Sequence, residues 1–111
     1  MAIPGLKFTK RGELPLGLSF VNSKTIVSRI CEHFKITYES LKCKSRVREL
    51  VYPRQACMYL LSKHTAMTLT AIGVLFDRDH TTVIHALQNI KDLMTIDDRI
   101  AREIEQLKNT L

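Results

Sequence analysis

The sequence lacks the features that would place a protein in a membrane or outside the cell. No apolar run approaches the about 18 residues that a membrane-spanning helix needs, and the first ten residues have no uninterrupted apolar core of a signal peptide. The three cysteines, Cys31, Cys43 and Cys57, are odd in number and have no C-x-x-C spacing. We therefore expect a cytoplasmic protein with reduced thiols and no zinc site.

The sequence also lacks the motifs of an enzyme. It has no G-x-x-x-x-G-K-[ST] loop or other glycine-rich cradle for a nucleotide, and no paired carboxylates, Cys–His pair or Ser–His–Asp set stands out. His80 and His85 come closest to a metal-binding pair. Residues five apart on a helix point about 140° away from each other, however, and no third ligand is evident. We expect no enzymatic activity, no cofactor and no metal.

Positive charge is concentrated in the first part of the chain. The net charge is +6 over 111 residues. The stretch from Lys7 to Lys63 contains twelve Lys and Arg and four Asp and Glu. The stretch from Asp77 to Leu111 contains five Lys and Arg and seven Asp and Glu. This asymmetry favours a polyanionic partner. A membrane surface is the poorer choice, because no basic amphipathic helix with a wide leucine or aromatic face is present.

The spacing of apolar residues predicts an all-α fold of about six helices. Ser23 begins the first helix, and Thr37 caps a short one from Tyr38 to about Leu41. Pro53 is predicted in the first turn of the next helix. The buried stripes of these two longer helices are predicted to be Ile26, Val27, Ile30, Cys31 and Phe34, and then Ala56, Cys57, Leu60 and Leu61.

The two ends of the chain are interpreted differently. Residues 1–21 carry two prolines and three glycines without any period, which predicts an irregular N-terminal arm, and residues 22–111 form the domain. Thr95 and Asp98 are interpreted as a capping pair for the last helix. Its apolar face is predicted to comprise Ile96, Ile100, Ile104, Leu107 and Leu111. A single stripe of this size favours an interior brace, and hence a monomer, over a dimer interface.

The stretch from Thr68 to Asn89 predicts two helices joined by a tight turn, around which the chain is organised. Thr68 is a good N-cap for the first helix. Asp77 and Arg78 interrupt the helical spacing, and Asp79 restarts it as a second N-cap, where its carboxylate also suits the helix dipole. The predicted buried residues are Leu69, Ile72 and Phe76 in the first helix, and Val83, Ile84, Leu87 and Ile90 in the second.

Short polar side chains remain at the tip and outer face of the second helix, and they suit a helix inserted into a DNA major groove. The Thr81 methyl group suits contact with a thymine methyl, and Asp79 can accept from a cytosine amino group. For Asp79, capping alone and capping plus a base contact both remain open. His80 can donate to or accept from a base edge, whereas Thr82 and His85 are predicted to face phosphates. Arg78 either supports Asp79 or contacts the DNA backbone.

The segment from Lys42 to Arg48, the basic segment, places four cations in seven residues, which favours a loop that follows the phosphates of a nucleic acid. In isolation the same composition would fit a solvated charge run. Beside the helix-turn-helix pattern we interpret it as part of a DNA-binding surface. Thr65, at the start of a connection, is a further candidate for a phosphate contact.

The stretch I-G-V-L-F-D-R-D-H-T-T-V-I-H-A-L-Q-N-I resembles the signature of the C-terminal DNA-binding domain (domain IV) of the DnaA replication initiator family, with D-H-T-T-V-x-H as its specific core. Y-P-R-Q-A-C-M-Y-L-L resembles another helix of that domain, and the resemblance runs from about Ser23 to Leu111. It implies a helix-turn-helix fold like that of the Trp repressor. It also implies that Arg46 reads the minor groove, that Arg48 lies at the DNA backbone and that Arg54 and Gln55 contact phosphates.

We therefore expect sequence-specific binding to double-stranded DNA, at sites like the DnaA box. Asp77 stands where the family has a glycine in a longer turn, and Tyr52 and Ser62 stand where arginine and lysine are common, so the preferred site need not be identical. A small helix-turn-helix regulator with its own operator and a protein-interaction module are the alternatives. Without an ATP-binding part, the chain is expected to be an excised domain or, favoured by Met1 and the arm, a stand-alone module.

Overall fold

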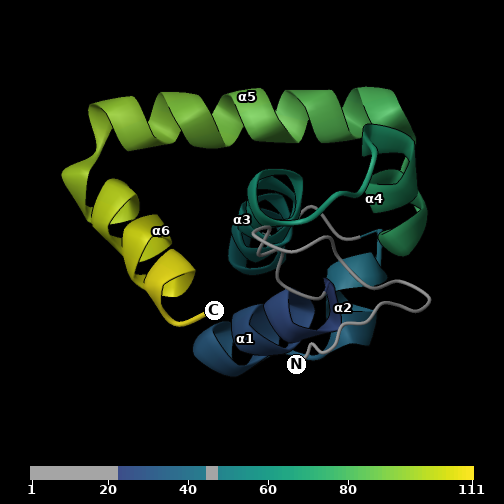
Figure 1. The fold of residues 1–111 in the computed structure, drawn as a ribbon, viewed down its shortest axis with the longest axis horizontal. Coiled ribbons are helices and arrows are strands. Elements are labelled where there is room, and N and C mark those ends of the chain that lie inside the picture. Colours follow the sequence, from purple (N-terminus) through teal and green to yellow (C-terminus); the bar gives the residue numbers. More distant parts are fainter. Residues whose placement is uncertain (1–22, 45–47) are drawn as a thin grey trace, which may run out of the picture.

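The computed structural model describes residues 23–44 and 48–111, and the predictions for residues 1–21 and Arg46 lie outside these ranges. Within them the chain forms six α-helices and no strand (Figure 1). The all-α prediction with about six helices is confirmed. The helices are α1 (Ser23–Phe34), α2 (Tyr38–Lys42), α3 (Arg48–His64), α4 (Leu69–Leu75), α5 (His80–Ile96) and α6 (Asp98–Asn109).

Helix α3 lies at the centre of the domain and contacts α1, α2, α4 and α5 (Figure 1). Its apolar face is fully enclosed, as the spacing predicted. Removing this much apolar surface from water is the main stabilising contribution to such a fold. The buried side chains of α3 are Ala56, Cys57, Met58, Leu60 and Leu61, and those of the other elements are Ile26, Ile30, Leu41, Ile72, Phe76, Val83, Ala86, Ile90, Ile104 and Leu107.

The connection from α1 to α2 follows from local chemistry. Lys35 adopts a left-handed backbone conformation with φ 57°, and the Ile36 N–H donates to the Cys31 carbonyl over 3.0 Å, which closes the end of α1. Thr37 then caps α2, because its hydroxyl oxygen accepts from the Ser40 N–H over 3.1 Å. Both the cap and the short helix were predicted.

Helix α3 begins earlier than predicted. It starts at Arg48, so Pro53 lies inside the helix and not in its first turn. A proline there cannot donate the bond to the Glu49 carbonyl four residues back, which is normally destabilising. The extensive burial of the following residues offsets this loss, and the helix continues through the proline.

Helix α6 also begins differently from the prediction. Its N-cap is Asp97, which accepts from the Arg99 N–H over 3.0 Å. Thr95 remains inside α5 and donates to the Lys91 carbonyl over 3.0 Å. Ile96 ends α5 with 78% of its surface exposed, so its predicted place on the inner face of the last helix is wrong. The other predicted positions hold: Ile104 and Leu107 are buried, and Ile100 and Leu111 pack against the core.

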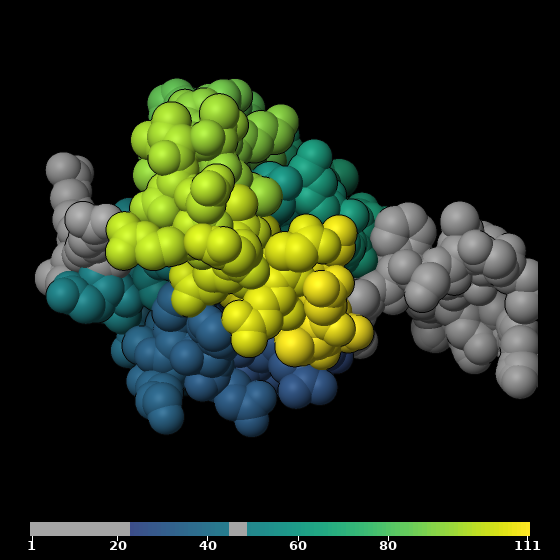
Figure 2. Space-filling model, turned by 90° about the vertical axis from the view of Figure 1, so that its left-hand side faces the viewer, coloured from purple at the N-terminus to yellow at the C-terminus, as the bar shows by residue number. Residues whose placement is uncertain are grey.

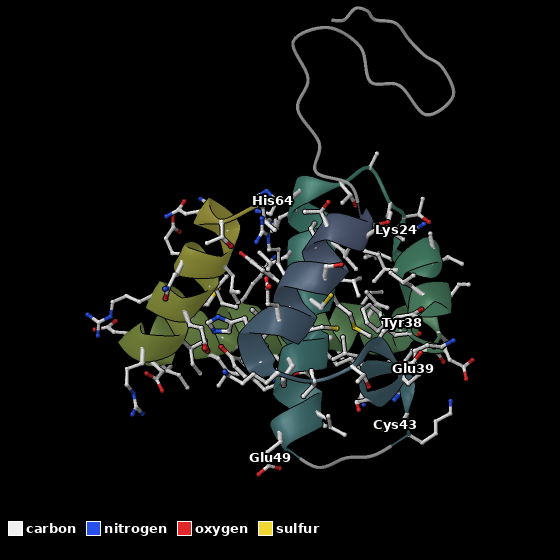
Figure 3. The ribbon with its side chains drawn as sticks, turned by 90° about the horizontal axis from the view of Figure 1, so that it is seen from below. Lys24, Tyr38, Glu39, Cys43, Glu49 and His64 are labelled. Carbon is white, nitrogen blue, oxygen red and sulfur yellow. The ribbon has the colours of Figure 1, made fainter. Side chains whose placement is uncertain are left out.

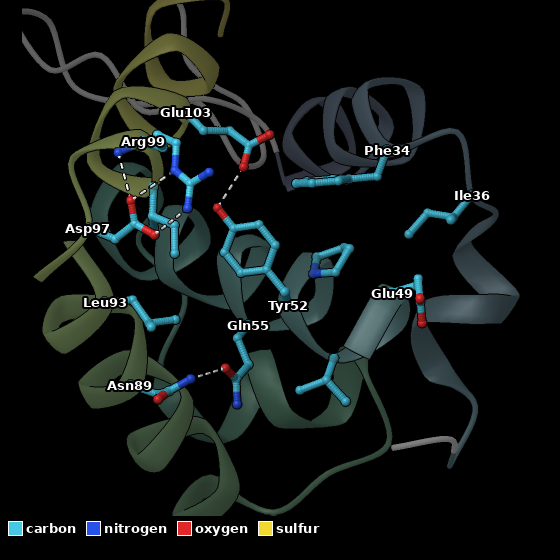
Figure 4. Close-up of a pocket in the computed structure, with 13 residues that line it drawn as sticks. Phe34, Ile36, Glu49, Tyr52, Gln55, Asn89, Leu93, Asp97, Arg99 and Glu103 are labelled. Atoms are coloured by element: carbon cyan, nitrogen blue, oxygen red, sulfur yellow. Dashed lines mark hydrogen bonds and ion pairs between the residues drawn. The ribbon is translucent and has the colours of Figure 1, made fainter. Parts of the chain in front are cut away.

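Helix α6 packs at the end of the molecule remote from α4 (Figures 1 and 2). Glu103 connects it to two other helices: its carboxylate accepts from the Tyr52 hydroxyl over 2.7 Å and lies 2.9 Å from His33 Nε2. An open groove of about 900 Å³ lies here between the end of α1 and helices α3, α5 and α6 (Figure 4). No helix in the described ranges is long and apolar enough to cross a membrane.

Candidate nucleic-acid interface

Helices α4 and α5 form the predicted helix-turn-helix. Thr68 caps α4, with its hydroxyl accepting from the Ala71 N–H over 3.1 Å. The chain then reverses direction through Phe76 and Asp77, and the Arg78 N–H donates to the Gly73 carbonyl over 2.7 Å. Asp77 has φ 58°, a left-handed conformation that glycine adopts most readily and that Asp tolerates better than most residues. This accounts for a turn in which Asp occupies a position suited to glycine.

Gly73 makes the tight turn possible. The Arg78 carbonyl oxygen lies so near the Gly73 Cα that an added Cβ would overlap with it. Because the obstacle is backbone rather than a flexible side chain, it cannot move aside without opening the turn. A residue without a side chain is therefore required at this position.

The tip of α5 is exposed, as the DNA-binding prediction requires. Asp79 caps the helix, its carboxylate accepting from the Thr82 N–H over 2.9 Å, and this bond lowers the pKa of Asp79. Around it the side chains of His80, Thr81, Thr82 and His85 all face solvent. The structure thus confirms the capping role of Asp79 and the accessibility of the polar tip.

Ile84 is not part of the buried stripe of α5, contrary to the prediction. It is 44% exposed, and Ala86 is buried together with Val83 and Ile90. Successive residues of a helix are rotated by about 100°, so Ile84 lies well off the Val83–Ile90 line. With Ala86 counted as an apolar position, the sequence pattern predicts the buried face Val83, Ala86 and Ile90 and leaves Ile84 outside it. Ile84 therefore adds an apolar side chain to the exposed surface of α5.

The Arg54 guanidinium turns inward and does not project toward solvent. It is buried with 6% exposure, its Nε donates to the Leu41 carbonyl over 2.6 Å, and its Nη2 donates to the Cys43 carbonyl over 2.9 Å. Burial, and then the nearby charge of Arg78, lower the pKa of Arg54. This placement fits a positioning role better than the predicted phosphate contact.

Arg78 also reaches α2 rather than Asp79. Its Nη1 donates to the Phe76 carbonyl over 2.8 Å and to the Lys42 carbonyl over 3.2 Å, and its Nη2 donates to the Cys43 carbonyl over 2.6 Å. Of the two predicted roles, support of Asp79 does not fit these contacts. Sequence reasoning missed this link to α2, and no local pattern signals it.

Gln55 and Thr65, two predicted phosphate contacts, are held by bonds within the protein. The Gln55 carbonyl oxygen accepts from Asn89 Nδ2 over 2.6 Å, which joins α3 to α5 (Figure 4). The Thr65 hydroxyl donates to the Leu61 carbonyl over 2.6 Å and accepts from the Met67 N–H over 3.2 Å. Both side chains are half-buried.

Lys44, the last described residue before Arg46, contacts the turn of the helix-turn-helix. Lys44 Nζ lies 3.5 Å from the Asp77 carboxylate and donates to the Asp77 carbonyl over 3.2 Å. Cys43 and Glu49 lie along the same edge of the molecule (Figure 3). Arg48 begins α3, and its side chain is outside the described residues. The basic segment therefore leaves α2 beside the turn that precedes α5.

The remaining reactive side chains form no second site. Among the residues that the structure describes, no three His, Cys, Asp or Glu side chains are grouped as a metal would require. Burial raises the pKa of the Cys57 thiol, and burial and the charge of Glu39 raise that of Cys31. Raised pKa values make both thiols poor nucleophiles.

The fold and this surface define the domain as one of the helix-turn-helix class. Residues 23–90 match the family described as the bacterial dnaA protein helix-turn-helix. The chain belongs to this family.

Relatives across several bacteria agree with this assignment. The chain is 37% identical over 91 residues to the chromosomal replication initiator protein DnaA of Caldanaerobacter subterraneus subsp. tengcongensis. The aligned stretch covers 82% of the chain and 20% of that protein. It is 37% identical over 94 residues to DnaA of Bdellovibrio bacteriovorus (84% and 20%) and 38% identical over 104 residues to DnaA of Brucella abortus (93% and 20%). The chain thus spans about a fifth of the length of these curated relatives.

Proposed function

We propose that this domain binds double-stranded DNA sequence-specifically, at sites resembling the DnaA box. The observation that carries the proposal is a helix-turn-helix of the DnaA family whose recognition helix presents an exposed polar tip. Binding requires no nucleotide cofactor in this chain, and the binding unit is a monomer. The protein acts on the nucleoid, where its partner is found.

The tip of α5 enters the major groove in this proposal. Asp79, His80 and Thr81 contact base edges, because side chains at the start of a recognition helix reach furthest into the groove. Thr82 and His85 contact the DNA backbone. The solvent exposure of all five side chains supports these roles.

Arg46 inserts into the adjacent minor groove, and Arg48 contacts the backbone. An arginine at such a position recognises the narrow groove and strong negative potential of A·T-rich DNA. The contact of Lys44 with the turn supports this placement, since it brings the start of the basic segment beside α5.

Gln55 is a further phosphate contact, with Thr65 a weaker one. The bond to Asn89 occupies the Gln55 oxygen, which leaves its amide nitrogen as the group to donate to a phosphate. The Thr65 hydroxyl would have to exchange its bond to Leu61 for one to DNA. Arg54 and Arg78 support this surface from within and are not assigned to phosphates.

Selection of binders from a random duplex pool, followed by a salt titration of the best site, tests the proposal. We expect one asymmetric site like the DnaA box and an affinity that falls steeply with salt. Arg46→Ala should lose about 1–3 kcal/mol and relax preference in an A·T-rich part of the site. Arg102→Ala, which removes an equal charge from the exposed side of α6, is the matched control and should bind as the wild type does.

Two results would contradict the proposal. Selection of palindromic half-sites about one helical turn apart would identify a dimeric regulator with its own operator. Absence of salt-dependent binding to any duplex would identify a protein-interaction module.

A further inference from the structure

The carbonyl groups at the end of α2 are satisfied in an unusual way. Helix C-termini leave their last carbonyls without partners inside the helix, and many helices end with a left-handed residue that supplies backbone donors. Cys43, the C-cap of α2, is extended instead, with φ −66° and ψ 161°. Its N–H covers the Glu39 and Ser40 carbonyls over 3.1 and 3.4 Å, and the next three carbonyls need other donors.

Two arginines from distant parts of the chain supply those donors. Arg54, from α3, bonds the carbonyls of Leu41 and Cys43. Arg78, from the turn between α4 and α5, bonds those of Lys42 and Cys43. Both guanidinium groups therefore meet at the Cys43 carbonyl oxygen, over 2.9 and 2.6 Å.

This arrangement requires arginine and not merely positive charge. Two cations that share one acceptor repel each other, and the partial negative charge of the carbonyls at a helix end offsets that repulsion. Each guanidinium reaches two carbonyls with separate nitrogens, Arg54 those of Leu41 and Cys43 and Arg78 those of Lys42 and Cys43. A single ammonium on a flexible stem cannot reproduce this geometry. The Tyr38 hydroxyl adds a third link, from the start of α2 to the Leu75 carbonyl at the end of α4.

We infer that Arg54 and Arg78 are positioning residues for DNA binding, and that neither of them contacts a phosphate. They fix Cys43 against the turn that precedes α5, and the chain runs from Cys43 into the basic segment. The end of α2 is thereby held at a fixed separation from the start of α5. The effect on DNA binding rests on the proposed function. The attachment of the end of α2 by Arg54 and Arg78 rests only on the hydrogen bonds described above.

The free protein tests the attachment without DNA. Modification of Cys43 by a thiol reagent, followed by peptide mass mapping, measures how firmly the end of α2 is held. Arg78→Lys and Arg78→Gln should each speed Cys43 modification by about three- to tenfold, the equivalent of one lost hydrogen bond. Arg102→Lys, on the exposed side of α6, should leave the rate unchanged. An unchanged rate in both Arg78 variants would overturn the inference.

The choice of lysine separates positioning from phosphate binding. A phosphate contact tolerates lysine as a point charge, so Arg78→Lys would bind DNA as the wild type does. A positioning role predicts instead that Arg78→Lys weakens binding as much as Arg78→Gln does. Wild-type affinity and salt slope in Arg78→Lys would overturn the positioning role. Circular dichroism confirms that each variant remains helical. Arg78 is half-exposed and Arg54 is buried, so substitution of Arg78 is less disruptive to the fold.

A double-mutant cycle of Arg78→Lys with Arg46→Ala measures the coupling between the two residues in DNA affinity. Loss of stability alone would not produce such a coupling. If Arg78 positions the basic segment, the fold-loss of DNA affinity caused by Arg46→Ala should be at least about threefold smaller in the Arg78→Lys background than in the wild type. A cycle of Thr82→Ala with Arg46→Ala is the control and should be additive. Additivity in the Arg78 cycle would overturn the inference. If the wild type binds no duplex, the proposed function fails, while the Cys43 rates still decide whether the attachment exists.

Discussion

The backbone carbonyl of Arg78 closes directly over Gly73, leaving no space for a methyl group on that residue. The contact joins α4 to the turn that precedes α5. It sets the angle at which α5 leaves the turn, and that angle determines where the tip of α5 points.

Replacing Gly73 by alanine should therefore destabilise the domain. Relief of the overlap requires the turn to open, and overpacking of this kind costs about 1–3 kcal/mol. Urea denaturation followed by circular dichroism measures the loss. Val74→Ala, at the neighbouring position with 73% exposure, is the control and should change stability by less than about 0.5 kcal/mol. Equal denaturation midpoints for Gly73→Ala and the wild type would refute the steric requirement.

Asp77 should tolerate substitution in an order set by its left-handed conformation. Glycine should be the most stable replacement and alanine less stable, and valine should be the worst, by about 1–2 kcal/mol relative to glycine. Thermal denaturation of the three variants gives the order. Lys35→Gly, at the other described non-glycine residue with positive φ, should stabilise the domain for the same reason. A valine variant as stable as the glycine variant would rule this explanation out.

The capping bond of Asp79 should make part of the stability depend on pH. Its carboxylate has a lower pKa in the folded state because it accepts from the Thr82 N–H, so the unfolded state binds the proton more readily. The contribution is present above the ordinary carboxyl pKa of 3.8 and disappears as the pH falls through the lower folded value. Denaturation across the acid range should show a wild-type dependence that is weaker in Asp79→Asn, which still caps but does not titrate. Identical profiles would show that Asp79 is not the group responsible.

Thr81→Ala should change base preference while leaving the salt dependence of binding as it is. The side chain is proposed to contact a base edge, and only phosphates neutralised by lysine or arginine enter the salt slope. Selection from the random duplex pool and a salt titration give the two quantities. Thr82→Ala is the neighbouring comparison: it should weaken binding to all sequences alike, without a change in the preferred site or the salt slope. An unaltered site for Thr81→Ala would remove Thr81 from base recognition.

Tyr52 is expected to contribute to stability and not to DNA affinity. Its hydroxyl donates to Glu103, and burial, followed by this bond, raises the pKa of Tyr52. Tyr52→Phe should cost about 1.5–3 kcal/mol of unfolding free energy, a typical value for a hydrogen bond to a charged acceptor. Chemical denaturation and duplex titration together provide the test. A loss of affinity in a variant of unchanged stability would place Tyr52 at the DNA surface.

The parts of the fold that the sequence predicts are those set by neighbours in the chain. Thr37, Thr68 and Asp79 cap their helices as expected, because a cap depends only on residues two or three positions away. The buried face of α1 follows from helical periodicity in the same way. The exposed tip of α5 is the complement of its buried face and was predictable on the same grounds.

The parts that the sequence does not predict depend on contacts between distant residues. Arg54 and Arg78 resemble surface cations in the sequence, and they turn inward because a helix end 11 to 36 residues away lacks donors. Ile96 was assigned to the wrong helix, because the boundary between α5 and α6 is set by the Asp97 cap. The start of α3 was misplaced because the proline rule holds only where packing does not override it.

The recognition helix is also, with α3, one of the two longest of the described helices, and it helps to form the core. α5 runs unbroken for 17 residues, with its polar tip at one end and Ile90 enclosed by the domain further along. Such a tip cannot tilt without moving the residues that hold α3, α4 and α6 together. Adjustment between protein and duplex must then come from the DNA. Sites with identical contacted bases will bind differently according to how easily their flanking steps bend.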